Sequence, residues 1–174
     1  MIPTAPVFYD CEASGLDGYV IEIGWAFVRP QQPQIVSAAC LVRPPAAWEI
    51  EDSWDTNAEE LHGLSLEQVR HQGLAVETIA ARMNRELEGR ELFSDSPYDE
   101  AWARQIFEAA DVEPAFVFRR MDADILLAQM VAARGLDLDR YRQAREQAEH
   151  ARRHRAEADA LLWAELWRWV TEGG

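Results

Sequence analysis

The chain of 174 residues has little of several features that mark particular classes of protein. Its only two cysteines, Cys11 and Cys40, lie in separate strand-like runs without metal-ligand spacing, so we expect reduced, buried thiols. No apolar run reaches the roughly 20 residues of a membrane-spanning helix. Residues 1–6 have neither a basic region nor an apolar signal core. These absences predict a cytoplasmic protein without a membrane partner.

Positive charge is also scarce. Seventeen basic residues stand against 31 acidic residues, which gives a formal net charge of -14. This balance argues against a protein that coats long nucleic acid non-specifically, because such binding depends on neutralising many phosphates. The exception is the segment 140–155, where six arginines stand against two glutamates. Basic character is therefore confined to one stretch near the last helix.

Hydrophobic residues make up 48% of the chain and include seven tryptophans, which predicts a single domain over residues 1–174. The pattern of apolar residues and turn signals predicts an α/β fold. The expected strands lie at 7–13, 19–28, 35–42, 92–94 and 116–118. Short helices are expected to follow an N-cap at Ser65 and to reach about residue 88, and further helices are expected at 98–110, with Pro97 in the first turn, at 122–134 and at 156–170. The Pro-marked linker 29–34 is short, so the first three strands are expected to form an antiparallel meander. The stretch 43–63 is expected to be irregular.

Two acids lie in the first strand. Because side chains alternate across a strand, Asp10 and Glu12 share one face and Cys11 takes the other. Two carboxylates in an apolar element are costly to bury unless a cation neutralises them, and a divalent ion with oxygen ligands is the usual cation. Taken alone, the pair fits a solvated loop start equally well.

Further acids occur where a buried helix face is expected. Asp99 precedes the apolar positions Trp102 and Ala103 by three and four residues, although an acid at a helix start is also favoured by the helix dipole. Asp159 lies three and four residues before Leu162 and Trp163, on the apolar stripe of the last helix. Such a buried carboxylate needs a partner. Separate segments thus deliver four acids to the interior, a set that can bind two divalent ions and position a phosphodiester for attack by water.

Five short motifs resemble, in order and spacing, those of the DEDDh 3′–5′ exonucleases, the family of the proofreading subunit of the bacterial replicative polymerase, ribonuclease T and oligoribonuclease. The motifs are D-C-E at 10–12, E-I-G at 22–24, H-G-L-S at 62–65, Y-D at 98–99 and H-R-A-E-A-D at 154–159. The resemblance implies a ribonuclease H-like fold, with a mixed five-stranded sheet flanked by helices. It also implies that Asp10, Glu12, Asp99 and Asp159 hold two Mg²⁺ or Mn²⁺ ions. His154 would then be the general base, a role that suits histidine because it exchanges protons near neutral pH.

The resemblance further implies a pocket for the 3′ nucleotide, lined by Ser14, Gly15, Leu16 and His62. Two departures from the family pattern stand out. Ala13-Ser14-Gly15 replaces the common T-T-G, and Ser94-Asp95 replaces the usual His-Asn before the Y-D motif. The second departure adds an acid, Asp95, that could compete with Asp99 for a metal ion. The arginines at 152, 153 and 155 beside His154 could bind phosphate groups or serve as ordinary surface charges.

The function that this pattern favours is a metal-dependent 3′–5′ exonuclease that acts on single-stranded or short DNA or RNA and releases nucleoside 5′-monophosphates. Two alternatives remain open at this level: a non-catalytic nucleic-acid-binding or accessory subunit of the same fold, and a phosphatase acting on small phosphate esters. The sequence does not separate DNA from RNA. A homodimer is plausible, because the last helix carries more tryptophan than one core face needs.

Overall fold

The protein is described by a computed structural model that covers residues 5–29 and 34–173. Its centre is a five-stranded sheet of order β3-β2-β1-β4-β5. The strands are β1 (Val7–Ala13), β2 (Val20–Val28), β3 (Ile35–Leu41), β4 (Glu91–Phe93) and β5 (Val117–Phe118). The first three strands pair antiparallel, whereas β4 lies parallel to both β1 and β5. The predicted mixed α/β sheet is confirmed, while most of the predicted 29–34 linker lies outside the described residues.

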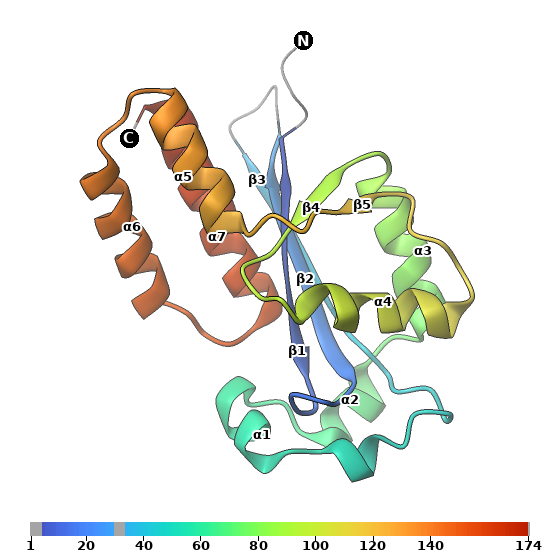
Figure 1. Ribbon diagram of the computed structural model, residues 1–174. Helices are drawn as coiled ribbons and strands as arrows, with labels where there is room; N and C mark the ends of the chain where they lie inside the picture. The colour runs from blue at the N-terminus through green and yellow to red at the C-terminus, as the bar shows by residue number, and fades with distance from the viewer. Residues whose placement is uncertain (1–4, 30–33, 174) are drawn as a thin grey trace.

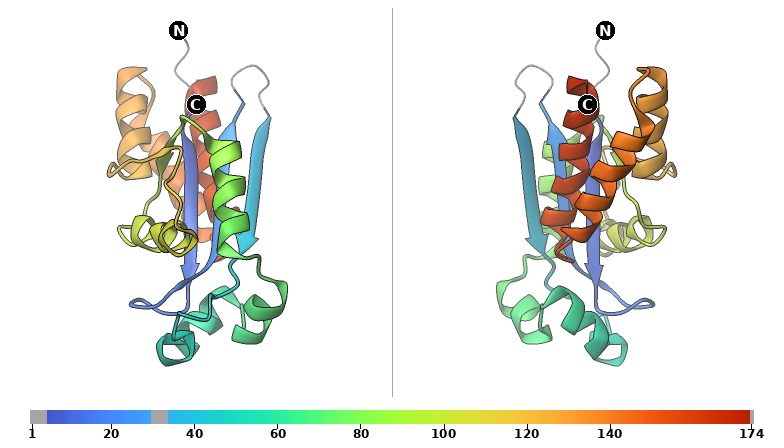
Figure 2. Two further views of the ribbon diagram at one scale, coloured as in Figure 1. Left: turned by 90° about the vertical axis from the view of Figure 1, so that its right-hand side faces the viewer. Right: turned by 90° about the vertical axis from the view of Figure 1, so that its left-hand side faces the viewer.

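Helices cover both faces of the sheet, as Figures 1 and 2 show. The helical elements are a 3₁₀ turn η1 (Ile50–Ser53), α1 (Thr56–His62), α2 (Leu66–Gln72), α3 (Val76–Leu87), α4 (Asp99–Ala110), α5 (Ala123–Ala133), α6 (Leu138–His150) and α7 (Ala156–Glu172). Helices α3 and α4 lie on one face, α5 and α7 lie on the other with α6 outside them, and α1 and α2 close one end. Among the described residues, no helix combines the length and apolar character needed to cross a membrane.

The alternation of side chains in β1 divides the core in two. Val7, Tyr9 and Cys11 are buried against α3 and α4, whereas Phe8 packs with residues of α5 and α7. Asp10 has the same parity as Phe8, so its carboxylate emerges on the face that α7 covers. One strand therefore supplies apolar contacts to one layer and carboxylates to the other.

Two predictions about local structure were wrong. The stretch 43–63 is not irregular throughout, because it contains η1 and α1; Asp55 caps α1 by accepting a hydrogen bond from the amide of Asn57, and Gly63 ends it with φ of 71°. These cap signals are present in the sequence, but a seven-residue helix is too short to show a clear apolar period. Pro97 lies before the N-cap Tyr98 rather than in the first turn, so α4 begins at Asp99. The predicted N-cap Ser65 is confirmed by its bond from the amide of Gln68.

The E-I-G motif in β2 holds the beginning of α7. The Glu22 carboxylate accepts hydrogen bonds from the amide of Ala156 at 3.0 Å and from the Arg155 guanidinium at 2.7 and 3.0 Å. Gly24 leaves no side chain beneath the helix, since a Cβ atom there would meet the Ala156 carbonyl carbon at 2.3 Å. Glu22 is thus a buried acid that binds a helix N-terminus.

We predict that Gly24→Ala displaces α7 and lowers the free energy of unfolding by about 3 kcal/mol or more, because the methyl group meets backbone atoms that cannot rotate away. Chemical denaturation followed by tryptophan fluorescence measures this loss. Gly135→Ala is the matched control: its Cβ would meet no atom within 4 Å, and its φ of 66° limits the cost to about 1 kcal/mol of backbone strain. Equal losses in the two variants would contradict the proposed close contact between β2 and α7.

Candidate metal centre

The four acids that the sequence singled out converge in space. Ligand oxygens of Asp10, Glu12 and Asp159 lie within 4.8 Å of one another. A second group of the same tightness joins Asp10 and Asp99 with Asp95. Asp10 belongs to both groups, so the two sets of oxygens share one carboxylate at the middle of the cluster.

Three elements position these side chains. Strand β1 places Asp10 and Glu12 on one face by its alternation. Asp99 is the first residue of α4, and its carbonyl accepts a contact from the Cys11 thiol at 3.7 Å, which ties the helix start to β1. Asp159 lies in the first turn of α7, where its Oδ1 accepts a hydrogen bond from the amide of Arg153 at 3.1 Å.

The cluster is buried and electrostatically strained. The exposed fraction is 5% for Asp10, 1% for Asp99 and 2% for Asp159. Burial raises the pKa of Asp10 well above its usual value, and the nearby Asp99 and Glu12 carboxylates raise it further. Burial likewise raises the pKa of Asp99, and the pKa of Glu12 rises to about 8 through burial and repulsion from Asp159. Without a cation, Asp10, Glu12 and Asp99 would therefore hold protons more strongly than ordinary carboxyl groups do.

Arg152 lies inside the acidic cluster, a placement that the sequence did not indicate. Its guanidinium forms two hydrogen bonds to Asp95, at 2.8 and 3.3 Å, and approaches Asp10 Oδ1 at 3.4 Å and Asp159 Oδ2 at 3.5 Å. Its side chain is 23% exposed. The opposing charge lowers the pKa of Asp10, Glu12 and Asp95 against the effect of burial. Arg152 thus offsets part, but only part, of the negative charge.

The oxygens of the cluster fit divalent cations. Asp99 Oδ2 is buried and has no hydrogen-bond partner among the described residues, a costly state for a carboxylate oxygen unless a ligand completes it. Five carboxyl groups meet one guanidinium, so ionising all of them would leave a large negative charge for cations to balance. Carboxylate oxygens are the ligands that Mg²⁺ and Mn²⁺ prefer. Asp10, Glu12, Asp99 and Asp159 are thus suited to hold such ions.

His154 lies in the loop between α6 and α7 and belongs to neither group of ligand atoms. It is partly buried and adopts a left-handed backbone conformation with φ of 50°, which is uncommon for a residue with a side chain. Its neighbours hold the loop: the amide of Arg153 bonds to Asp159, and Arg155 bonds to Glu22. The loop conformation is therefore fixed beside the acidic cluster.

The four residues predicted to line a nucleotide pocket do not share one environment. Ser14 is fully buried; its hydroxyl accepts from the Tyr19 amide at 3.0 Å and lies 3.0 Å from the Ser53 hydroxyl, while its amide donates to the Tyr19 carbonyl. Gly15 is buried, whereas the neighbouring Leu16 is 60% exposed. A nucleotide could thus reach Leu16 directly, but the polar groups of Ser14 already have partners inside the protein.

His62, the last of the four, is 5% exposed at the end of α1. Its Nδ1 accepts a hydrogen bond from the amide of Leu64 at 3.0 Å, so the neutral ring carries its proton on Nε2. That nitrogen is buried and forms no hydrogen bond among the described residues. The nearby Ala13 backbone raises the pKa of His62 but does not meet the geometry of a hydrogen bond. Burial has the larger effect and lowers the pKa of His62. The neutral form of the ring is therefore favoured, and it carries an N–H at the end of β1.

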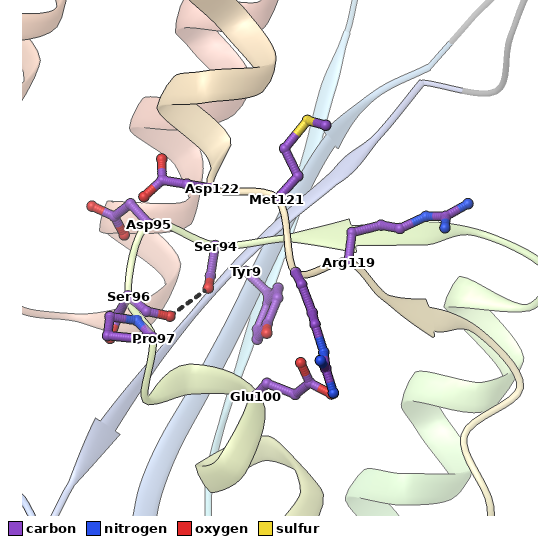
Figure 3. A pocket seen from close by; sticks show the side chains of 10 residues that line it. Tyr9, Ser94, Asp95, Ser96, Pro97, Glu100, Arg119, Met121 and Asp122 are labelled. Atoms are coloured by element: carbon purple, nitrogen blue, oxygen red, sulfur yellow. Dashed lines mark hydrogen bonds between the residues drawn. The ribbon is translucent and has the colours of Figure 1, made fainter.

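A pocket of about 360 Å³ adjoins the acidic cluster (Figure 3). It lies between the β4–α4 loop and the β5–α5 loop, and Asp95 borders both the pocket and the carboxylates. Asp95 and Asp122 lie at one end of the pocket and Arg119 at the other. The pocket is lined by Tyr9, Ser94, Asp95, Ser96, Pro97, Glu100, Arg119, Arg120, Met121 and Asp122. Asp95 thus stands on the boundary between an open surface and the buried acids.

No protein-family profile and no curated protein sequence matches the chain. Solved structures of exonuclease I from Escherichia coli are similar in fold. The zinc-bound form in complex with single-stranded DNA gives a TM-score of 0.68 at 14% identity over 97% of this chain, and the complex with a dT13 oligonucleotide gives 0.65 at 13% identity over 98%. The chain spans 40% and 41% of the length of those chains. The similarity confirms the ribonuclease H-like class of fold.

Stability of the metal-free protein should fall as the pH rises. An acid whose pKa is higher in the folded chain than in the unfolded chain stabilises the fold at low pH, and this contribution is lost as the pH rises through the folded-state pKa. For Glu12 the window runs from its ordinary 4.5 to about 8. We expect the Tm in chelator to drop by about 5 °C or more between about pH 5.5 and pH 8.5, and Mn²⁺ to reverse most of the drop.

Asp10→Asn is the informative variant in the same thermal scans. Because it removes the carboxylate shared by both groups, its metal-free Tm at about pH 8.5 should equal or exceed that of the native protein, while Mn²⁺ should no longer raise it. Asp111→Asn, at an exposed position beyond α4, should behave like the native chain. A native Tm that is independent of pH and of Mn²⁺ would contradict the raised pKa values of the buried carboxyl groups.

Proposed function

We propose that the chain is a metal-dependent 3′–5′ exonuclease of the DEDDh type, with residues 1–174 forming one exonuclease domain. It would hydrolyse phosphodiester bonds at the 3′ end of single-stranded or short nucleic acids and release nucleoside 5′-monophosphates. The observation that carries the proposal is the convergence of Asp10, Glu12, Asp99 and Asp159 from three separate elements, with ligand atoms in two groups that share Asp10.

The residues divide into two ligand sets. Asp10, Glu12 and Asp159 would hold one divalent ion, and Asp10 with Asp99 would hold the other. Two Mg²⁺ or Mn²⁺ ions supply the activation of a water molecule and the neutralisation of charge on the phosphodiester. The chain's own part is to keep these carboxylates in place, and the burial of Asp99 and Asp159 excludes bulk water from their oxygens.

His154 is proposed to accept the proton of the attacking water. Histidine suits this step because the neutral ring can take up a proton near neutral pH. The loop that carries it is held by the contacts of Arg153 and Arg155 to Asp159 and Glu22. Leu16, exposed beside β1, is proposed to contact the terminal base, with Ser14, Gly15 and His62 forming the wall behind it.

A single-stranded substrate is supported by two independent points. Exonuclease I, whose fold this chain resembles, has been solved with single-stranded oligonucleotides bound. The net charge of -14 disfavours extended contact with a long duplex. We therefore infer that the protein binds the substrate mainly through its 3′ end, at the acidic cluster.

The first prediction is that Asp10→Ala or Asp159→Ala abolishes Mn²⁺-dependent release of nucleotide from a 3′-labelled single strand while circular dichroism remains native. Each change removes ligand oxygens that no described side chain replaces. Asp111→Ala is the control and should retain full activity.

The same assay with a duplex and with a simple phosphate ester tests the two alternative functions. Ester hydrolysis without strand degradation indicates a phosphatase, and strand binding without turnover indicates an accessory subunit. Full nuclease activity in excess chelator would refute the metal mechanism.

The second prediction concerns His154. His154→Gln should lower kcat about 10²–10⁴-fold and remove the rise of kcat with pH, while Mn²⁺ affinity, measured by calorimetry, stays within about threefold, because the side chain is proposed to move a proton and not to bind the ion. His150→Gln, on the exposed side of α6, is the matched control. An unchanged pH profile in His154→Gln would exclude His154 as the general base.

A further inference from the structure

Arg152 makes more contacts with the acidic cluster than any other described cation. It approaches one oxygen of Asp10 and one of Asp159, which belong to the proposed ligand set, but its shortest contact and its only pair of hydrogen bonds are with Asp95. Two parallel N–H···O bonds to one carboxylate are the strongest geometry that arginine forms. The guanidinium is therefore oriented mainly by Asp95, with one longer hydrogen bond to Asp10 at 3.4 Å and a 3.5 Å contact with Asp159.

Asp95 and Arg152 are coupled in charge as well as in space. Asp95 is the acid that departs from the pattern of the DEDDh family, and it adds one negative charge to the four carboxylates of the proposed metal site. Two divalent cations balance four carboxylates, so the fifth needs one further positive charge. Arg152 supplies that charge at 2.8 Å. The pair is neutral as a unit, and it leaves the charge balance of the metal centre unchanged.

The contacts of Arg152 also bear on whether Asp95 binds a metal ion or remains the partner of Arg152. If Asp95 bound an ion, Arg152 would lose its pair of hydrogen bonds to Asp95. It would keep Asp10 at 3.4 Å and Asp159 at 3.5 Å, both then occupied by metal, and the half-exposed Glu149 at 3.6 Å. If Asp95 keeps Arg152, ions can displace the guanidinium from Asp10 and Asp159 without leaving it unpaired. Keeping Arg152 on Asp95 costs less, because a partly buried guanidinium left with only a distant, half-exposed partner is expensive.

We propose that Asp95 anchors Arg152 at the edge of the metal centre, and that the anchored guanidinium binds the phosphate of the substrate's 3′-terminal nucleotide. This inference rests on the proposed function. A guanidinium has five N–H donors, and the two bonds to Asp95 leave donors that now point at Asp10 and Asp159. With ions held by those oxygens, the same donors would be free to bind a phosphate at the metal centre. Asp95 is thus a positioning residue, and Arg152 contacts substrate.

A double-mutant cycle on Mn²⁺ affinity, measured by calorimetry without nucleic acid, tests the anchor. In the native background, Asp95→Asn releases Arg152 onto Asp10 and Asp159, so Mn²⁺ binding should weaken about tenfold or more. In the Arg152→Gln background no arginine is present to compete, so the same change should cost less than about threefold. Equal losses in both backgrounds would show that Asp95 is itself a metal ligand and would overturn the proposal.

Binding of thymidine 5′-monophosphate in Mn²⁺ tests the phosphate contact without any turnover. Arg152→Gln should weaken its binding about tenfold, the loss expected for charge-assisted hydrogen bonds, and Arg152→Lys should weaken it less. Arg153→Gln is the matched control, since its side chain is exposed and the net charge changes equally. Thymidine, which lacks the phosphate, should bind both variants as it binds the native protein. Unchanged monophosphate affinity in Arg152→Gln would refute the contact.

Failure of this inference is distinguishable from failure of the proposed function. If the native protein releases no nucleotide from a 3′-labelled strand, the exonuclease proposal fails, although the Mn²⁺ cycle can still be read. If the native protein is active but the cycle shows equal losses, only the role of the Asp95–Arg152 pair is wrong. Thermal unfolding of each variant confirms that the protein is folded before either comparison is made.

Discussion

The contact of the α7 N-terminus with β2 is the constraint on which the candidate site depends. Asp159 reaches the β1 acids only because the helix begins directly over the strand, where Gly24 presents bare backbone and the Glu22 carboxylate accepts the first amide of the helix. The same contact fixes Arg155 and with it the loop that carries His154. A motif in an apolar strand thus determines the geometry of a site to which it contributes no proposed ligand.

The cluster of acids works against the stability of the fold. Burial and mutual repulsion raise the pKa of Asp10 and Asp99, which means that ionising them without a cation is unfavourable. Arg152 reduces this cost, but Asp99 Oδ2 has no hydrogen-bond partner in the part of the chain that the structure describes. Such unrelieved strain is typical of functional sites, where the missing partner is a ligand. If the proposed function is correct, divalent ions would serve both as cofactor and as the positive charge that stabilises the folded cluster.

Much of the fold could be predicted from the sequence, because β1 alternates cleanly and α7 carries a continuous apolar stripe. The convergence of Asp10 and Asp159 followed from those periodicities together with the motif spacing. The position of Arg152 could not be predicted, since the loop before α7 has no periodic pattern and a long side chain selects its partner only in the folded protein. Helix α1 was missed because seven residues show its caps but not its period.

The central claim is that these acids form a two-ion site. Its most direct measurement is the anomalous difference map of a crystal soaked in Mn²⁺. The account predicts two peaks, one among Asp10, Glu12 and Asp159 and one between Asp10 and Asp99, with Arg152 still bonded to Asp95. A map without peaks at these carboxylates, from crystals that diffract well and hold Mn²⁺ in the solvent, would contradict it.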